Sequence, residues 1–194
     1  MYDAINSIYT YKNSEVLKNK LDIRSEKKLK QYETEMVSFK LSTIKDAGIA
    51  RSYDEKHLKA IHKHLFEDVY DFAGEYRKEN ITKENFRFSE FQYIDDNIKE
   101  ILNKINLDKC RKMKFEDLVV FISQIMTDLN VLHPFREGNG RATREFIREL
   151  LDDLGYEINW FLIDYNDILK ASIKAVIDET DQIELLKKSI KKKE

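Results

Sequence analysis

The sequence is poor in residues that make tight turns and covalent cross-links. It contains one proline, five glycines and one cysteine in 194 residues. Antiparallel β folds need many turn residues, so this scarcity favours long helices joined by few tight turns. The single Cys110 excludes an intramolecular disulfide and is typical of a protein that works in a reducing compartment.

A strong charge of one sign and long apolar runs are also missing. Lys and Arg number 34, Asp and Glu number 36, and the formal net charge is −2. Such a chain has no global attraction for nucleic acid or an anionic membrane. No apolar stretch approaches the ~20 residues of a membrane span, and the N-terminus lacks the apolar core of a signal peptide. We therefore expect a cytoplasmic protein without nucleic-acid or membrane partners, although an effector secreted without such a signal also fits.

Apolar residues recur at helical spacing through most of the chain. Ser25 and the pair Ser52 and Glu55 are expected to cap two of the helices, and Gly155 to end another. One segment, Asn80–Phe91, instead has the composition of a short β-hairpin. The tail KKSIKKKE is expected to be a solvated helix end. The predicted helices cover roughly residues 25–39, 52–69, 94–105, 118–132, 141–154, 168–176 and 183–190.

The few turn residues crowd into one stretch, residues 129–146, which reads LNVLHPFREGNGRATREF. Pro134 cannot continue a helix and disfavours helical geometry in the preceding residue, so His133 should lie just beyond a helix end. Phe135 is apolar among polar neighbours and is expected to turn inward. A histidine at such a rim is a natural general base, with a reference pKa near 6.5.

The glycines of this stretch predict an anion site. Gly138, Asn139 and Gly140 accept positive φ at low cost, so the loop could turn successive N–H groups toward one anion. A helix beginning at about Arg141 would add its N-terminal dipole, and Arg144 lies on the same face.

Arg148 extends that face, and Glu137 precedes the glycines. Mg²⁺ typically takes one or two carboxylates together with phosphate oxygens, so the combination indicates a polyphosphate site with a cation on Glu137. Each feature has a simpler interpretation: the glycines form an ordinary turn, and the arginines pair with Glu145 and Glu149.

The stretch from His133 to Arg144 resembles the signature of the Fic family, H-x-F-x-(D/E)-G-N-G-R-x-x-R, at every fixed position. The segment HLFEDVYDFAGEYR, residues 64–77, is similar to the family's segment before the active-site flap. Residues 81–88, ITKENFRF, resemble the flap itself. The resemblance implies an all-α Fic fold, a helical bundle with a small β-hairpin flap over the active site. It also implies one Fic domain over residues 1–194, with an N-terminal extension, a core of about 53–176 and a flap of about 80–91.

The resemblance implies a protein adenylyltransferase that moves AMP from ATP to a tyrosine, threonine or serine hydroxyl of a target protein. His133 would be the catalytic base and Glu137 would hold Mg²⁺. The flap would also bind the target by strand addition. The implied nucleotide-binding residues are Gly138, Asn139, Gly140, Arg141, Arg144, Lys83, Glu84, Asn85 and Phe86. Both glycines of the G-N-G loop are present, which favours AMP transfer over the phosphorylation of the Doc branch.

Fic enzymes are commonly silenced by a helix bearing (S/T)-x-x-x-E-(G/N), whose glutamate pairs with the second arginine of the motif, Arg144 here. The matching spacing in this chain is Thr180 to Glu184, but Leu185 follows in place of Gly or Asn. The resemblance thus favours a toxin-like enzyme that a small antitoxin inhibits in trans. The alternatives are a Fic-fold enzyme that transfers another phosphate-containing group, and an inactive nucleotide-binding module.

Overall fold

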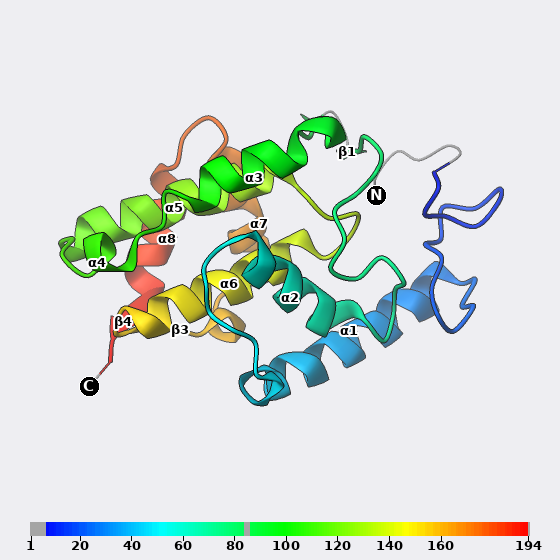
Figure 1. Ribbon diagram of the computed structural model, residues 1–194, viewed down its shortest axis with the longest axis horizontal. Coiled ribbons are helices and arrows are strands. Elements are labelled where there is room, and N and C mark those ends of the chain that lie inside the picture. Colours follow the sequence, from blue (N-terminus) through cyan, green and yellow to red (C-terminus); the bar gives the residue numbers. More distant parts are fainter. Residues whose placement is uncertain (1–6, 84–85, 194) are drawn as a thin grey trace.

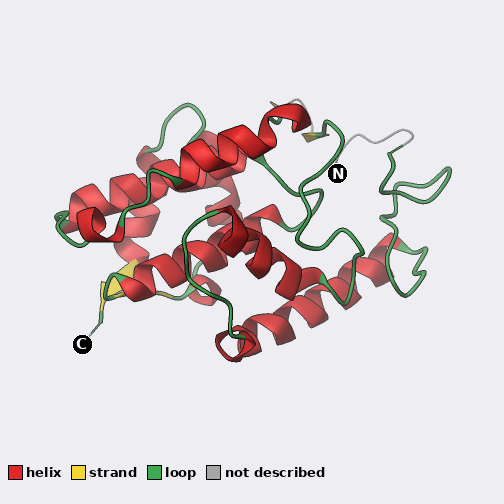
Figure 2. Ribbon diagram, viewed as in Figure 1, coloured by secondary structure: helices red, strands yellow, loops and turns green. Residues whose placement is uncertain are grey.

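A computed structural model describes residues 7–83 and 86–193 of the chain. Helices dominate this part, as the low glycine and proline content predicts, and two short antiparallel strand pairs complete it (Figure 2). The predicted all-α fold class with a small hairpin is confirmed. The helices are α1 Glu26–Thr43, α2 Glu55–Phe66, α3 Ile94–Leu102, α4 Leu107–Cys110, α5 Phe115–Leu132, α6 Asn139–Asp153, α7 Tyr165–Lys174 and α8 Thr180–Ser189. The strands are β1 Thr82–Lys83, β2 Phe86–Arg87, β3 Tyr156–Ile158 and β4 Ile190–Lys192.

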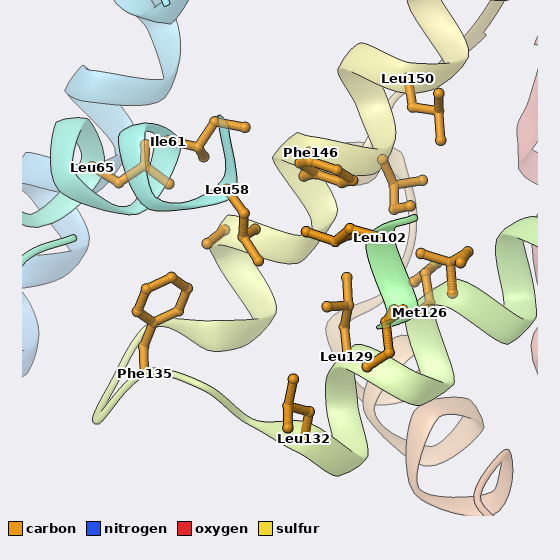
Figure 3. Packing of buried hydrophobic residues seen from close by; sticks show 14 of the residues in the cluster. Leu58, Ile61, Leu65, Leu102, Met126, Leu129, Leu132, Phe135, Phe146 and Leu150 are labelled. Atoms are coloured by element: carbon orange, nitrogen blue, oxygen red, sulfur yellow. The ribbon is translucent and has the colours of Figure 1, made fainter. Parts of the chain in front are cut away.

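The core lies where α5 and α6 meet α2. Figure 1 shows α1, α2 and α6 on one side of the molecule and α3 and α5 along the other, with α7 and α8 behind. Apolar side chains from α2, α5 and α6 interdigitate between them, with Phe146 of α6 at the centre (Figure 3). Phe135 of the α5–α6 loop packs into the same cluster, so the loop is anchored to the core as predicted.

Of the two predicted N-caps, one is confirmed and the other is wrong. Ser25 caps α1, and its side chain accepts a hydrogen bond from the Lys28 N–H, as predicted. The prediction for α2 is wrong, because Asp54 is the N-cap and Ser52 donates to its carboxylate at 2.6 Å. A carboxylate is the stronger acceptor for helix N–H groups, and it outcompetes the hydroxyl two residues earlier.

The C-terminal tail does not end as a frayed helix. Residues Ile190–Lys192 form β4, which pairs antiparallel with β3, and Lys193 contacts the Asp152 carboxylate at the end of α6. The burial of Ile190 explains the departure, because one apolar residue within the charge run has a place in the core. None of the described helices is both long and apolar enough to cross a membrane.

Candidate active site

The α5–α6 loop places His133 at the first position after α5. His133 caps that helix in the left-handed conformation, with φ 48°, and its N–H donates to the Leu129 carbonyl at 2.9 Å. A non-glycine residue rarely adopts positive φ, so the surroundings must hold it there. Pro134 accounts for the break, since its ring excludes continued helix.

Arg77 helps to stabilise this backbone conformation of His133. Its guanidinium donates to the carbonyls of His133 at 2.8 Å and Leu132 at 3.2 Å, at the negative end of the α5 dipole. The same group donates to the carbonyls of Glu79, at 2.8 Å, and Ser89, which flank the flap. One buried cation therefore joins the base of the flap to the backbone of His133.

His62 of α2 fastens the other end of the loop. The Gly74 N–H donates to its Nδ1 at 2.9 Å, so its Nε2 carries the hydrogen and donates to the Glu137 carbonyl at 2.9 Å. The ring stacks on Phe135 with centroids 3.8 Å apart. Burial lowers the pKa of His62 to about 4, which keeps it neutral in this role.

Asn139 closes the loop through its side chain. Its amide donates to the Phe135 carbonyl at 2.7 Å and accepts from the Phe135 N–H at 2.8 Å. Gly138 has φ 80°, and a Cβ there would lie 2.2 Å from the Phe66 ring. Asn139 and Gly140 are instead helical, so the prediction of positive φ at all three positions is wrong.

The N-terminus of α6, and not a loop of residues with positive φ, presents the N–H groups for an anion. α6 begins at Asn139, two residues before the predicted start at Arg141. The first N–H groups of a helix lack partners within it and carry the positive end of its dipole. Gly140 is exposed at this end, so an anion can approach the backbone closely.

His133 has the properties of a proton acceptor. Its Nδ1 lies 3.1 Å from the Asn130 carbonyl, which can only accept, so Nδ1 carries the hydrogen and Nε2 is the basic nitrogen. Its ring stacks on Phe88 beside the flap, with centroids 3.9 Å apart. Burial, with the nearby Arg77 and Lys83 cations, lowers the pKa of His133 to about 3, so the ring is neutral at neutral pH.

Glu137 fits the predicted cation site. One carboxylate oxygen, Oε1, accepts from the Gly138 N–H at 2.9 Å and lies 3.4 Å from Arg141 Nη2. No hydrogen bond is formed by the other oxygen, Oε2, to the residues that the structure describes. The described residues hold no group of three metal-ligating side chains, so a cation on Glu137 would need nucleotide oxygens to complete its shell.

The three arginines of α6 have different partners. Arg148 pairs with Glu145 at 2.6 Å, which is the simpler interpretation of a salt-bridged face. Arg141 pairs with Glu33 of α1 at 2.6 Å. Arg144 forms no ion pair within residues 7–83 and 86–193, and burial together with the Arg141 cation lowers its pKa. Arg144 is thus a half-buried cation in need of an anion.

The flap is a short hairpin. Thr82 pairs with Arg87 and Lys83 with Phe86, so the two strands have two residues each. Lys83 is half-buried and lines the same groove as His133, whereas Phe86 is exposed. The other two predicted flap residues, Glu84 and Asn85, lie outside the described residues.

A groove of about 1260 Å³ joins these elements. One wall is the face of α1 around Glu33 and Val37, and the other is formed by the loop and the arginines of α6. Part of the segment 158–172, including Trp160 and Tyr165, also lines the groove. The Trp160 indole donates to the Arg144 carbonyl at 2.9 Å and fixes this aromatic end against α6.

Sequence reasoning missed Glu33, His62 and Arg77, which act on the loop from elsewhere in the chain. Glu33 carried a usable signal, because it lies between Leu29 and Val37 at helical core spacing. A charged residue at a core position of a helix must have a buried partner. His64 of α2 takes no such part, since its Nε2 lies 3.2 Å from the Lys40 carbonyl of α1.

A model of the Fic/DOC family matches residues 52–151, more than half of the chain. The protein belongs to the Fic family. The chain is 32% identical to the protein adenylyltransferase VbhT of Bartonella schoenbuchensis over 95% of its own length, and spans 39% of that protein. It is 31% identical to the probable protein adenylyltransferase Fic of Escherichia coli, covering 78% of this chain and 76% of that protein. These names support a nucleotidyltransferase activity.

Solved Fic-domain structures share the fold. BepC of Bartonella tribocorum, crystallised with AMPPNP, aligns with TM-score 0.86 at 22% identity over 96% of this chain and 97% of that one. The Fic domain of a Bartonella quintana effector, crystallised with ADP, aligns with TM-score 0.87 at 24% identity over 96% and 95%. At such identities the likeness shows the fold alone.

Proposed function

We propose that this protein transfers AMP from ATP to a hydroxyl side chain of a target protein. The observation that carries the proposal is that three features line one groove: the basic Nε2 of a neutral His133, the N-terminus of α6, and Arg144, which has no ion-pair partner among the described residues. In Fic relatives named protein adenylyltransferases the same family fold carries this activity.

The geometry of the groove supports the following roles. The first N–H groups of α6, at Asn139 and Gly140, would bind phosphate oxygens, and Arg144 would take the terminal phosphate. The target hydroxyl would attack the α-phosphate in line while His133 Nε2 accepts its proton, and pyrophosphate would leave. The bound phosphates would raise the low proton affinity of His133, because their negative charge favours imidazolium.

Glu137 would hold Mg²⁺ through its Oε2. The cation would supply charge neutralisation on the phosphates when bound. Arg141 has less freedom for phosphate than the family resemblance implies, since Glu33 already binds it at 2.6 Å. The flap would hold the target by main-chain pairing, which suits two short strands with exposed side chains on β2.

Labelled ATP separates the reaction from its alternatives. The protein is incubated with Mg²⁺, cell lysate and ATP labelled at the α- or the γ-phosphate. AMP transfer puts label on protein from the α-position alone, whereas phosphoryl transfer does so from the γ-position alone. If neither form of labelled ATP labels any protein in several lysates, although the protein still binds ATP, the result would favour an inactive nucleotide-binding module.

We also propose that inhibition comes from a separate small protein, as in a toxin–antitoxin pair. The support is that Arg144 lines the open groove and that no carboxylate of the described residues forms an ion pair with it. Glu184, the residue at the inhibitory spacing, is exposed on α8 and lies 3.9 Å from Lys188. A Glu184→Ala variant should therefore label targets at the wild-type rate. A rise of about tenfold or more would place the inhibitor within this chain.

A further inference from the structure

An ion-pair cluster joins α1 to the first turn of α6 and to Glu137 of the α5–α6 loop. Arg141 Nη2 lies 2.6 Å from Glu33 Oε1 and 3.4 Å from Glu137 Oε1, so one cation is shared unequally by two carboxylates. Glu33 lies outside residues 52–151, which the family model matches. Its connection to Arg141 spans 108 positions of the sequence.

Glu33 is fixed in place. It is 7% exposed, and its second oxygen, Oε2, accepts a hydrogen bond from the Tyr70 hydroxyl. A buried carboxylate costs free energy unless both oxygens are satisfied, and here Tyr70 and Arg141 satisfy one each. Glu35 on the same helix is exposed and bonds only to Gln31 among the described residues, which makes it a matched contrast.

The unequal sharing matters for Glu137. Arg141 is itself mostly buried, with 24% of its side chain exposed, so its charge needs an anion. With Glu33 present, the shorter contact of the Arg141 guanidinium is to Glu33 on α1. Without the Glu33 charge, the remaining carboxylate beside Arg141 would be Glu137. A guanidinium drawn onto Glu137 would compete with a divalent cation for that carboxylate.

We propose that Glu33 is a positioning residue that holds Arg141 on α1, so that the Glu137 carboxylate stays open to the divalent cation bound with the nucleotide. The inference rests on the proposed function, because it assumes that nucleotide and cation meet at Glu137. It assigns to α1 a part in the active site, and it makes Arg141 a structural cation more than a phosphate ligand.

The measurement is the affinity for AMPPNP by calorimetry, with and without Mg²⁺. The ratio of the two affinities reports how strongly the cation and the nucleotide bind together. In Glu33→Gln this ratio should fall at least about fivefold. Without Mg²⁺ the affinity should stay the same or rise, because a negative charge has left the groove. Glu35→Gln removes an equal charge from the exposed face of α1 and should leave the ratio unchanged.

A second background shows whether Glu33 acts through Arg141. In Arg141→Gln, the further change Glu33→Gln should leave the ratio where it was, because the Arg141 guanidinium is no longer there to move onto Glu137. Tyr70→Phe loosens Glu33 without removing its charge and should lower the ratio by a smaller factor. Thermal melts of each variant identify any loss of folding.

The outcomes separate the two proposals. If Mg²⁺ strengthens AMPPNP binding to the wild type but Glu33→Gln keeps the same ratio, the role of Glu33 is overturned and the proposed function stands. If Glu33→Gln lowers the ratio equally in the Arg141→Gln background, the path through Arg141 is wrong. If Mg²⁺ leaves wild-type AMPPNP binding unchanged, the cation site at Glu137 fails, and the inference fails with it.

Discussion

The α5–α6 loop and the flap line one groove, and they are held in different ways. The loop, residues 133–138, is buried and tied from outside itself, by Arg77, His62 and the Asn139 side chain. The flap has two strands of two residues, and both residues of β2 are exposed. Under the proposed function this difference has a physical reason: the transfer reaction needs a fixed geometry, whereas a hairpin that pairs through its backbone could hold targets of different sequence.

The largest expected effect is on the loop's chemistry. His133→Ala removes the proposed base and should slow AMP transfer by about 10²–10⁴-fold, the range for a lost general base. ATP affinity should change little, because the phosphate contacts lie on α6. Single-turnover labelling and ATP titration measure the two effects separately. Transfer at the wild-type rate would exclude His133 as the base.

The rigidity of the loop can be tested at Gly138. Gly138→Ala would put a Cβ 2.2 Å from the Phe66 ring at φ 80°, and should lower the free energy of unfolding by about 3 kcal/mol. Gly155→Ala is the control, because Gly155 has φ 83° and no atom within 4 Å of the added Cβ. Gly155→Ala should lower the free energy of unfolding by only about 1–2 kcal/mol, the penalty of placing a Cβ at positive φ. Urea unfolding curves compare the two variants. Equal losses of unfolding free energy would show that the Phe66 ring moves aside at little cost.

The buried histidines of the loop predict a pH dependence of stability. Burial lowers the pKa of His62 to about 4 and of His133 to about 3, below the unfolded value near 6.5. Between these values the unfolded chain binds protons that the folded protein does not. Stability should therefore be complete above pH 6.5 and fall toward pH 4, by up to about 1.4 kcal/mol per pH unit for each histidine.

His62→Gln provides the comparison for this pH dependence. The variant should lose less stability than the wild type between pH 6.5 and pH 4, because one proton-binding group of the unfolded chain is gone. Urea unfolding at several pH values measures the difference. Parallel curves for the two proteins would show that His62 does not titrate as its burial implies.

The smallest effect is expected in the flap. Phe86→Ser changes an exposed side chain of β2 and should alter stability by no more than about 0.5 kcal/mol. If the target pairs with the flap backbone, transfer should fall only a few-fold, with ATP affinity unchanged. A loss as large as that of His133→Ala would mean that the flap shares in the chemistry, and the contrast between the two regions would break down.

The sequence predicts what is local. The break at Pro134, the inward turn of Phe135 and the helix after the glycines all depend on residues within a few positions of one another. Ser25 and Gly155 mark helix ends correctly for the same reason.

The sequence alone could not show which distant partners share the space. Phe39 of α1 is 61% exposed although it is apolar, while Glu33 is buried on that helix because Arg141 and Tyr70 bind it there. Ile190 leaves its helix to pair with β3, which local periodicity does not predict. The roles of the site residues and the domain limits, with a core of about 53–176, remain predictions.

Mass spectrometry of a labelled target is the direct test of AMP transfer with His133 as the base. A protein labelled from α-labelled ATP in lysate is isolated, and the mass added to its modified residue is measured after reaction with wild type and with His133→Ala. We expect one AMP group on a tyrosine, threonine or serine hydroxyl with the wild type, and none with His133→Ala over the same time. A different added group, or an equal yield of AMP from His133→Ala, would contradict it.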